Sequence, residues 1–256
     1  MQIYLAPMEG ITGYIVRNAF AHNFAGIDKY FTPFIPAAKR LNYKIERDLD
    51  PENNKGIRLV PQLISNDADE TLEMIKLLKN YGYNEFNINL GCPSGTVASK
   101  KRGSGLLLYP GELERYLDSL YEKADVPISL KTRIGYNSLE EWPVLLKIFS
   151  RYPASELIIH PRLKKELYSG FPHLKAFADA YNLHSLDICY NGDIWNPENY
   201  HSLTADFPAL DKIMIGRGLL AKPFLAELIK DLSISGPGSS PAPDSLMAPE
   251  NIQKNK

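Results

Sequence analysis

The chain has 256 residues and a formal net charge of −1, which excludes a uniformly basic nucleic-acid binder but not a local basic patch. Its two cysteines, Cys92 and Cys189, exclude a disulfide framework and a cysteine-rich zinc site, and they suit a reducing cytosol. The N-terminus lacks the basic and apolar regions of a signal peptide, and no run approaches the ~18 apolar residues of a membrane span, so we expect a cytoplasmic protein.

Short runs rich in strand-forming residues alternate with amphipathic runs of helical period. The strands are predicted at residues 2–5, 28–31, 58–63, 85–89, 127–132, 156–160, 187–190 and 212–215. The helices are predicted at residues 69–81, 112–124, 139–150, 174–181, 197–203 and 223–232. Eight strands alternating with helices in this length indicate an α/β fold, namely a (β/α)8 TIM barrel.

An open, doubly wound parallel sheet is the alternative architecture. The barrel is favoured because polar residues follow nearly every predicted strand, and barrel enzymes build their active sites at the C-terminal ends of their strands. We assign residues 1–232 to the barrel. Residues 233–256 are rich in Ser, Pro and Gly, and we expect them to form a disordered tail.

Cys92 directly follows the predicted strand 85–89 and precedes a glycine-rich basic loop at residues 99–105. Most free cysteines are small buried hydrophobic residues, and this is one interpretation. A thiol in a loop at the mouth of a strand is also typical of a catalytic cysteine. Because its ordinary pKa is about 8.5, such a thiol is mostly protonated at neutral pH and can act as an acid.

Period-two alternation places Lys131 and Arg133 on one face of their strand, and Asn87 and Asn89 on one face of theirs. Two cations at the end of a buried strand need an anionic or acceptor-rich partner, because burying an unpaired charge is costly. That partner is either a carboxylate of the barrel or a ligand. His160 ends the next strand, either as a hydrogen-bonded core histidine or as a ligand-binding residue.

The last two strands are followed by Asn-Gly-Asp at 191–193 and Gly-Arg-Gly at 216–218. These are ordinary turn sequences, but loops at this position of a barrel commonly bind phosphate. Pro7 and Met8 follow the first strand and can contact the face of an aromatic ring, while Gln62 can hydrogen-bond the edge of a heterocycle. Together these groups suggest a flavin mononucleotide (FMN) site.

Six short motifs carry a resemblance to a known family. They are Ala-Pro-Met at 6–8, Asn-Leu-Gly-Cys-Pro at 89–93, Lys-Thr-Arg at 131–133, His-Pro-Arg at 160–162, Asn-Gly-Asp at 191–193 and Gly-Arg-Gly at 216–218. In this order, each after its own strand, they resemble the flavin-dependent tRNA dihydrouridine synthases from Met1 to about Leu232. This family reduces the C5–C6 double bond of uridines in tRNA, using NADPH to reload the flavin.

The resemblance implies a role for each matching residue. Cys92 is implied to be the catalytic acid, giving a proton to C5 while hydride from the reduced flavin reaches C6. The target uracil is implied to contact Asn89, Arg133 and Tyr168. The residues implied to hold FMN are Pro7, Met8, Gln62, Lys131, His160, Asn191, Gly192, Asp193, Gly216 and Arg217. The expected partner is tRNA, with no membrane, no metal and a monomeric state.

Some positions depart from the family pattern. Gly95 stands where the family usually has a lysine, Asn87 where it commonly has an aspartate, and Pro161 where it has a glycine. The family's helical C-terminal domain is expected to be missing or truncated, which would remove phosphate contacts and weaken RNA binding.

Two other functions remain compatible with the sequence. An FMN-dependent barrel reductase could act on a free pyrimidine or an enone instead of tRNA. The third hypothesis is a non-catalytic barrel that binds flavin or RNA without turnover. The joint presence of Cys92, Lys131 and His160 argues against it.

Overall fold

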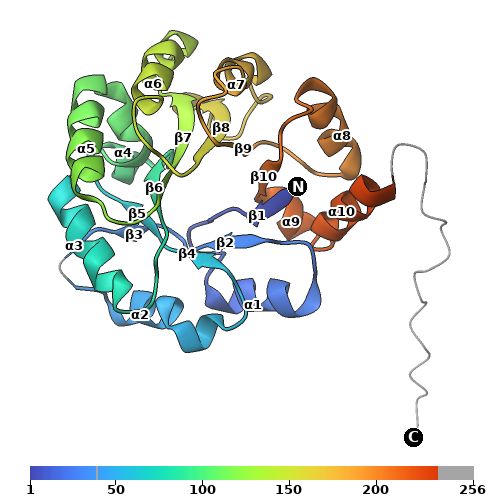
Figure 1. The fold of residues 1–256 in the computed structure, drawn as a ribbon, viewed down its shortest axis with the longest axis horizontal. Helices are drawn as coiled ribbons and strands as arrows, with labels where there is room; N and C mark the ends of the chain where they lie inside the picture. Colours follow the sequence, from blue (N-terminus) through green and yellow to red (C-terminus); the bar gives the residue numbers. More distant parts are fainter. Residues whose placement is uncertain (39, 236–256) are drawn as a thin grey trace, which may run out of the picture.

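The computed structural model describes residues 1–38 and 40–235. Ten parallel strand segments form one curled sheet in the order β3-β5-β6-β7-β8-β9-β10-β1-β2-β4, and the helices lie around it (Figure 1). The strands are β1 (Gln2–Leu5), β2 (Lys29–Phe31), β3 (Ile35–Pro36), β4 (Leu59–Val60), β5 (Gln62–Ile64), β6 (Phe86–Leu90), β7 (Ile128–Gly135), β8 (Leu157–Leu163), β9 (Ile188–Tyr190) and β10 (Lys212–Ile215).

Ten α-helices and four short 3-10 helices connect the strands within these residues. The α-helices are α1 (Tyr14–Asn23), α2 (Tyr43–Leu49), α3 (Ala68–Lys79), α4 (Gly95–Ala98), α5 (Pro110–Lys123), α6 (Trp142–Phe149), α7 (Leu174–Tyr181), α8 (Pro197–Asp206), α9 (Arg217–Ala221) and α10 (Leu225–Ser235). The 3-10 helices are η1 (Pro51–Asn54), η2 (Gly103–Leu108), η3 (Leu139–Glu141) and η4 (Lys164–Glu166).

The α/β class and the parallel sheet are confirmed, with changes at several boundaries. The predicted strand 58–63 is divided into β4 and β5 by Pro61, and β3 was not predicted. Helix α10 runs to Ser235, past the predicted end at Leu232. The remainder of the predicted tail, 236–256, lies outside the described residues.

Local sequence accounts for the helix ends. The side chain of Asp67 accepts a hydrogen bond from the backbone N–H of Glu70 at 2.9 Å and so caps the start of α3. Lys76 and Lys79 stand in the last turn of the same helix, where positive charge is favourable. Helix α5 begins with Pro110, whose missing N–H costs nothing at a first helical position.

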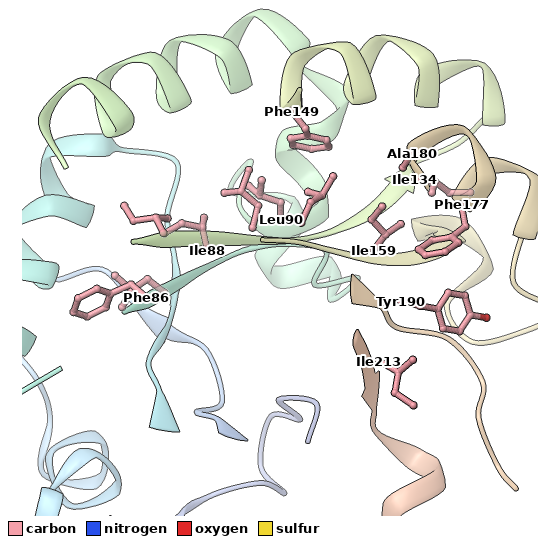
Figure 2. Packing of buried hydrophobic residues seen from close by; sticks show 14 of the residues in the cluster. Phe86, Ile88, Leu90, Ile134, Phe149, Ile159, Phe177, Ala180, Tyr190 and Ile213 are labelled. Carbon is pink, nitrogen blue, oxygen red and sulfur yellow. The ribbon is translucent and has the colours of Figure 1, made fainter. Parts of the chain in front are cut away.

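The two faces of the sheet bury different sets of side chains. Ile88, Leu90 and Ile159 pack outward against the helices, with Phe149 of α6 and Phe177 of α7 close by (Figure 2). A separate cluster faces the other way and consists of Tyr4, Ala6, Phe31, Val60, Ile158, Cys189 and Met214. Strand alternation explains this division, since successive residues of one strand point to opposite faces.

Glu156 is buried on the inner side, next to this second cluster. The hydroxyl of Tyr4 donates a hydrogen bond to its Oε1 at 2.9 Å, while its Oε2 has no hydrogen-bond partner within the described residues. Burial raises the pKa of Glu156 above its usual value, although the nearby ammonium of Lys29 acts in the opposite direction. The folded protein therefore holds a proton here more tightly than the unfolded chain does.

This carboxyl group should make stability depend on pH. Its contribution is fully present below pH 4.5, the ordinary value, and is lost as the pH rises through the raised pKa. Glu156→Gln keeps an acceptor for Tyr4 but carries no titrating proton. We expect its melting temperature to fall less than that of the wild type as the pH rises from about 5 to about 8. The control Glu73→Gln changes an exposed residue and should keep the wild-type dependence of melting temperature on pH. The same dependence in all three proteins would show that Glu156 does not cause it.

Candidate active site

A hollow of about 90 Å³, partly open to solvent, lies beside Lys131 of β7 and His160 of β8 and among the loops that follow β1, β9 and β10. The hollow is lined by Ala6, Pro7, Met8, Lys131, His160, Tyr168, Asn191, Gly192, Asp193, Ile194, Trp195, Gly216, Arg217 and Gly218. Nine of the ten residues predicted to hold the flavin therefore line one cavity, the exception being Gln62.

Two glycines allow the loops around this hollow to approach closely. A Cβ added at Gly218 would lie 1.9 Å from the carbonyl oxygen of Ile194, which leaves no room for any side chain. A Cβ at Gly216 would lie 3.3 Å from the Cβ of Ala6 and 3.5 Å from the Sδ of Met8. The loops after β1, β9 and β10 thus form one continuous wall.

Charged groups on that wall are held by ion pairs. Asp193 accepts hydrogen bonds from Arg162 at 2.6 Å and from Arg217 at 2.6 Å. Arg162 is fully buried and also donates to the carbonyl oxygen of Gly170 at 2.8 Å. A buried guanidinium needs such partners, so Asp193 is a structural centre of the wall as well as a lining residue.

His160 is buried beside these cations. Its Nε2 lies 3.2 Å from Nη1 of Arg162, and because arginine can only donate, Nε2 is the acceptor and the proton resides on Nδ1. Burial lowers the pKa of His160 well below its usual value, helped by Arg133, Lys131 and other nearby cations. The imidazole is therefore neutral at physiological pH.

Lys131 lines the hollow and, within the described residues, forms no ion pair with a carboxylate. Its ammonium has no hydrogen-bond or ion-pair partner among residues 1–38 and 40–235. Burial, with a further contribution from the positive charge of Arg133, lowers its pKa to about 8. The group remains mainly protonated at neutral pH, so it offers an unused positive charge to an anionic or electron-rich ligand.

The loop that carries Cys92 is fixed by hydrogen bonds to its backbone. Oδ1 of Asn89 accepts from the N–H of Gly91 at 3.0 Å and from that of Cys92 at 2.8 Å. On the other side, the hydroxyl of Ser104 donates to the carbonyl oxygen of Cys92 at 2.7 Å. The position of the thiol is therefore set before any substrate binds.

The environment of Cys92 keeps its sulfur protonated. Burial raises the pKa of the thiol, and this effect exceeds the opposing influence of Arg133 and Lys131. Strand register brings these groups together, since Asn89 of β6 lies beside Lys131 of β7. The site is suited to donating a proton from sulfur, in contrast to the thiolate of a nucleophilic cysteine.

A chain of buried amides supports Asn89 from behind. Its Nδ2 donates to Oε1 of Gln62 at 2.8 Å, and Nε2 of Gln62 donates to Oδ1 of Asn87 at 2.7 Å. Asn87 in turn donates to the hydroxyl of Ser129 at 2.8 Å. Gln62 is only 1% exposed and is absent from the lining of the hollow, so its predicted contact with the flavin stays a prediction.

Arg133 joins two loops of the site. Its Nε donates to the carbonyl oxygen of Gly91 at 3.1 Å, and its Nη1 donates to those of Leu163 at 3.0 Å and Leu167 at 2.7 Å. Nη2 has no such backbone acceptor, and the guanidinium lies 5.4 Å from the ring centre of Tyr168. Arg133 therefore positions the loops on both sides of the site.

The side chains at the hollow that were assigned no role from the sequence include Arg162, which holds Asp193, and Trp195, which lines the hollow. Arg162 had a detectable signal, because alternation along β8 puts it on the same face as His160. Trp195 stands in a loop and had no such periodic signal. Within the described residues, no three His, Cys, Asp or Glu side chains form a possible metal site, and none of the helices is long and apolar enough to cross a membrane.

Comparison with known proteins agrees with this geometry. Residues 4–241 match the family model for dihydrouridine synthase. The chain is 31% identical over 239 residues to a "tRNA-dihydrouridine(16) synthase" of Pseudomonas syringae, covering 90% of this chain and 74% of that protein. It is 31% identical to "tRNA-dihydrouridine synthase B" of Pasteurella multocida over 90% of this chain and 69% of the relative. A match spanning this much of both chains shows that the protein belongs to the dihydrouridine synthase family.

Proposed function

We propose that this protein is an FMN-dependent oxidoreductase that reduces the C5–C6 double bond of uridines in tRNA, with NADPH as the reductant. The observation that carries the proposal is the convergence of nine predicted cofactor residues on one hollow, with the Cys92 loop held beside it. The names of the relatives supply the tRNA substrate. The two free cysteines suit the reducing cytoplasm where tRNA is modified.

The proposal includes a closed eight-stranded barrel. Segments β4 and β5 are separated only by Pro61, and they pair with β2 and β3 through Tyr30–Leu59 and Ile35–Leu63. The two ends of the linear strand order therefore belong to two neighbouring strands, each interrupted once. If each interrupted pair is counted as one strand, eight strands follow one another around a ring.

The residues around the hollow fit FMN. The unpartnered ammonium of Lys131 suits the electron-rich edge of a reduced flavin, and Met8 suits the face of its ring system. Gly192, Gly216 and Arg217 would hold the phosphate through backbone N–H groups and a guanidinium. When bound, FMN supplies the hydride for C6 of the uracil.

The residues of the chain complete the reduction. The protonated thiol of Cys92 gives its proton to C5, so that one hydride and one proton together saturate the double bond. The guanidinium of Arg133 would donate to a uracil carbonyl, and the ring of Tyr168 beside it would offer a stacking surface. The oxygen of Asn89 is committed to the Cys92 loop, which leaves one N–H of its amide for the base.

Removing the unpaired cation should weaken flavin binding. We expect Lys131→Met to bind FMN about 10- to 150-fold more weakly, since a hydrogen bond to a charged group contributes roughly 1.5–3 kcal/mol. Lys131→Arg should retain part of the affinity. Equilibrium dialysis against FMN measures both, with the exposed Lys175→Met as the matched control. Wild-type affinity in Lys131→Met would remove Lys131 from the cofactor site.

The activity itself is tested with unmodified tRNA. Purified protein, FMN and NADPH should form dihydrouridine in a tRNA transcript, detected by mass spectrometry of the digested nucleosides. Free uridine in the same assay separates this function from a small-molecule reductase. A preference for the free nucleoside would contradict the proposal. We also expect a monomer, which light scattering during gel filtration can check.

A further inference from the structure

Three aromatic side chains stand exposed beside the hollow: Tyr168 is 52% exposed, Phe171 88% and Trp195 38%. We call these three residues the aromatic ledge. An exposed apolar patch on a protein surface commonly marks a binding site. The proposed reaction assigns no role to Phe171 or Trp195.

The loop that carries Tyr168 and Phe171 is held firmly in place. Arg162, which is fully buried, donates to the carbonyl oxygens of Ser169 at 3.3 Å and Gly170 at 2.8 Å, directly before Phe171. Arg133 fixes the same loop by its bond to Leu167. Buried guanidinium groups at both ends of the segment therefore hold the exposed Phe171 in a defined place.

A cation lies between two rings of the aromatic ledge. The guanidinium of Arg217 lies 4.7 Å from the ring centre of Tyr168 and 5.2 Å from that of Trp195. Asp193 holds it there at 2.6 Å. Alternating aromatic and guanidinium planes are a surface on which nucleobases stack well.

Beyond Trp195, a second hollow of about 310 Å³ opens between α7 and α8. It shares Asp193, Ile194 and Trp195 with the candidate active site, so the two hollows are separated by one wall. Phe171 and Leu174 form apolar parts of its lining, and Asn199, Ser202 and Asp206 add hydrogen-bonding groups. The carboxylate of Asp206 disfavours a phosphate there and favours a base that carries amino hydrogens.

We propose that the aromatic ledge and the second hollow bind the base of a nucleotide that flanks the target uridine. This inference rests on the proposed function, because a uridine extruded to the site beside Cys92 and Arg133 leaves its neighbours without their stacking partner. Tyr168, which lies against Arg133 and is proposed to contact the uracil, belongs to the ledge and so puts the replacement surface next to the uridine. The exposed ring of Phe171 supplies the stacking face. The ledge thus lowers the cost of extruding the target base.

Steady-state kinetics with tRNA as the substrate test whether the aromatic ledge binds a base. Phe171→Ala should raise the KM for a tRNA transcript about 5- to 150-fold, the range expected from one lost base stack, with a much smaller effect on kcat. Phe171→Tyr keeps an aromatic face and should restore most of the affinity. The control is Val144→Ala, an exposed apolar residue of α6 outside both hollows, which should behave as the wild type.

Fluorescence gives a readout that needs no turnover. The chain has two tryptophans, and Trp142 is 1% exposed, so quenching by added tRNA reports on Trp195. We expect tRNA to quench the flavin-loaded wild type and Phe171→Tyr, and to quench Phe171→Ala only at higher concentration. A wild type that forms no dihydrouridine in tRNA contradicts the proposed function. A wild type that does so, with KM and quenching unaltered in Phe171→Ala, contradicts the ledge alone.

Discussion

Cys92→Ala is expected to lower the rate of dihydrouridine formation about 10²- to 10⁴-fold, the usual contribution of a positioned general acid. The thiol is kept protonated by burial, and its backbone is fixed by Asn89 and Ser104, so alanine removes the proton without moving the loop. Flavin reduction by NADPH does not need this proton and should continue. Single-turnover mixing of the reduced enzyme with tRNA measures the step directly.

Cys189 provides the matched control. It is also a free thiol, but it is fully buried in the inner cluster, whereas Cys92 is only partly buried. Cys189→Ala should keep dihydrouridine formation within a few-fold of the wild type. If Cys92→Ala modified tRNA at the normal rate, another group would have to be the proton donor.

Asp193→Ala is expected to destabilise the fold by about 3–5 kcal/mol, the cost of removing one partner from a buried ion pair. The aspartate neutralises Arg162, whose side chain is 0% exposed, and also holds Arg217. Without it, the guanidinium of Arg162 stays buried without a carboxylate partner. Chemical denaturation measures the free energy of unfolding, and the flavin content should fall with it.

Asp125→Ala tests whether the burial of Arg162 causes the loss of stability expected for Asp193→Ala. Asp125 pairs with Lys79 at 2.6 Å, the same distance as Asp193 to Arg162, but its side chain is 71% exposed. Because water and salt screen an exposed pair, this variant should lose little stability. Equal losses in the two variants would show that the burial of Arg162 does not control the effect.

The strand pattern was largely predictable from sequence because alternation is local information. The run 156–160 alternates between the two faces, and the structure indeed divides Ile158 from Ile159. Helix α1 was missed for an equally local reason. Gly13 gives it no side-chain cap, and Ile15 and Val16 are β-branched residues that also favour strands.

Side-chain partners across the site could not be predicted from sequence. The ion pair of Asp193 with Arg162 joins residues 31 positions apart, and its formation depends on how the loops after β8 and β9 meet. The same holds for Gln62, whose hydrogen bonds reach Asn87 and Asn89 on the neighbouring strand, while its predicted contact with a ligand stays a prediction. Local patterns indicate which residues share a face, but the fold decides which of them touch.

In the proposed reaction, a flavin in the first hollow passes hydride to a tRNA uridine beside Cys92. The most direct measurement is the visible absorption of the FMN-loaded protein without oxygen. NADPH should bleach the flavin band, and subsequent addition of unmodified tRNA should restore it, while tRNA that already carries dihydrouridine should not. Failure of unmodified tRNA to restore the band, or equal restoration by both tRNAs, would contradict the account.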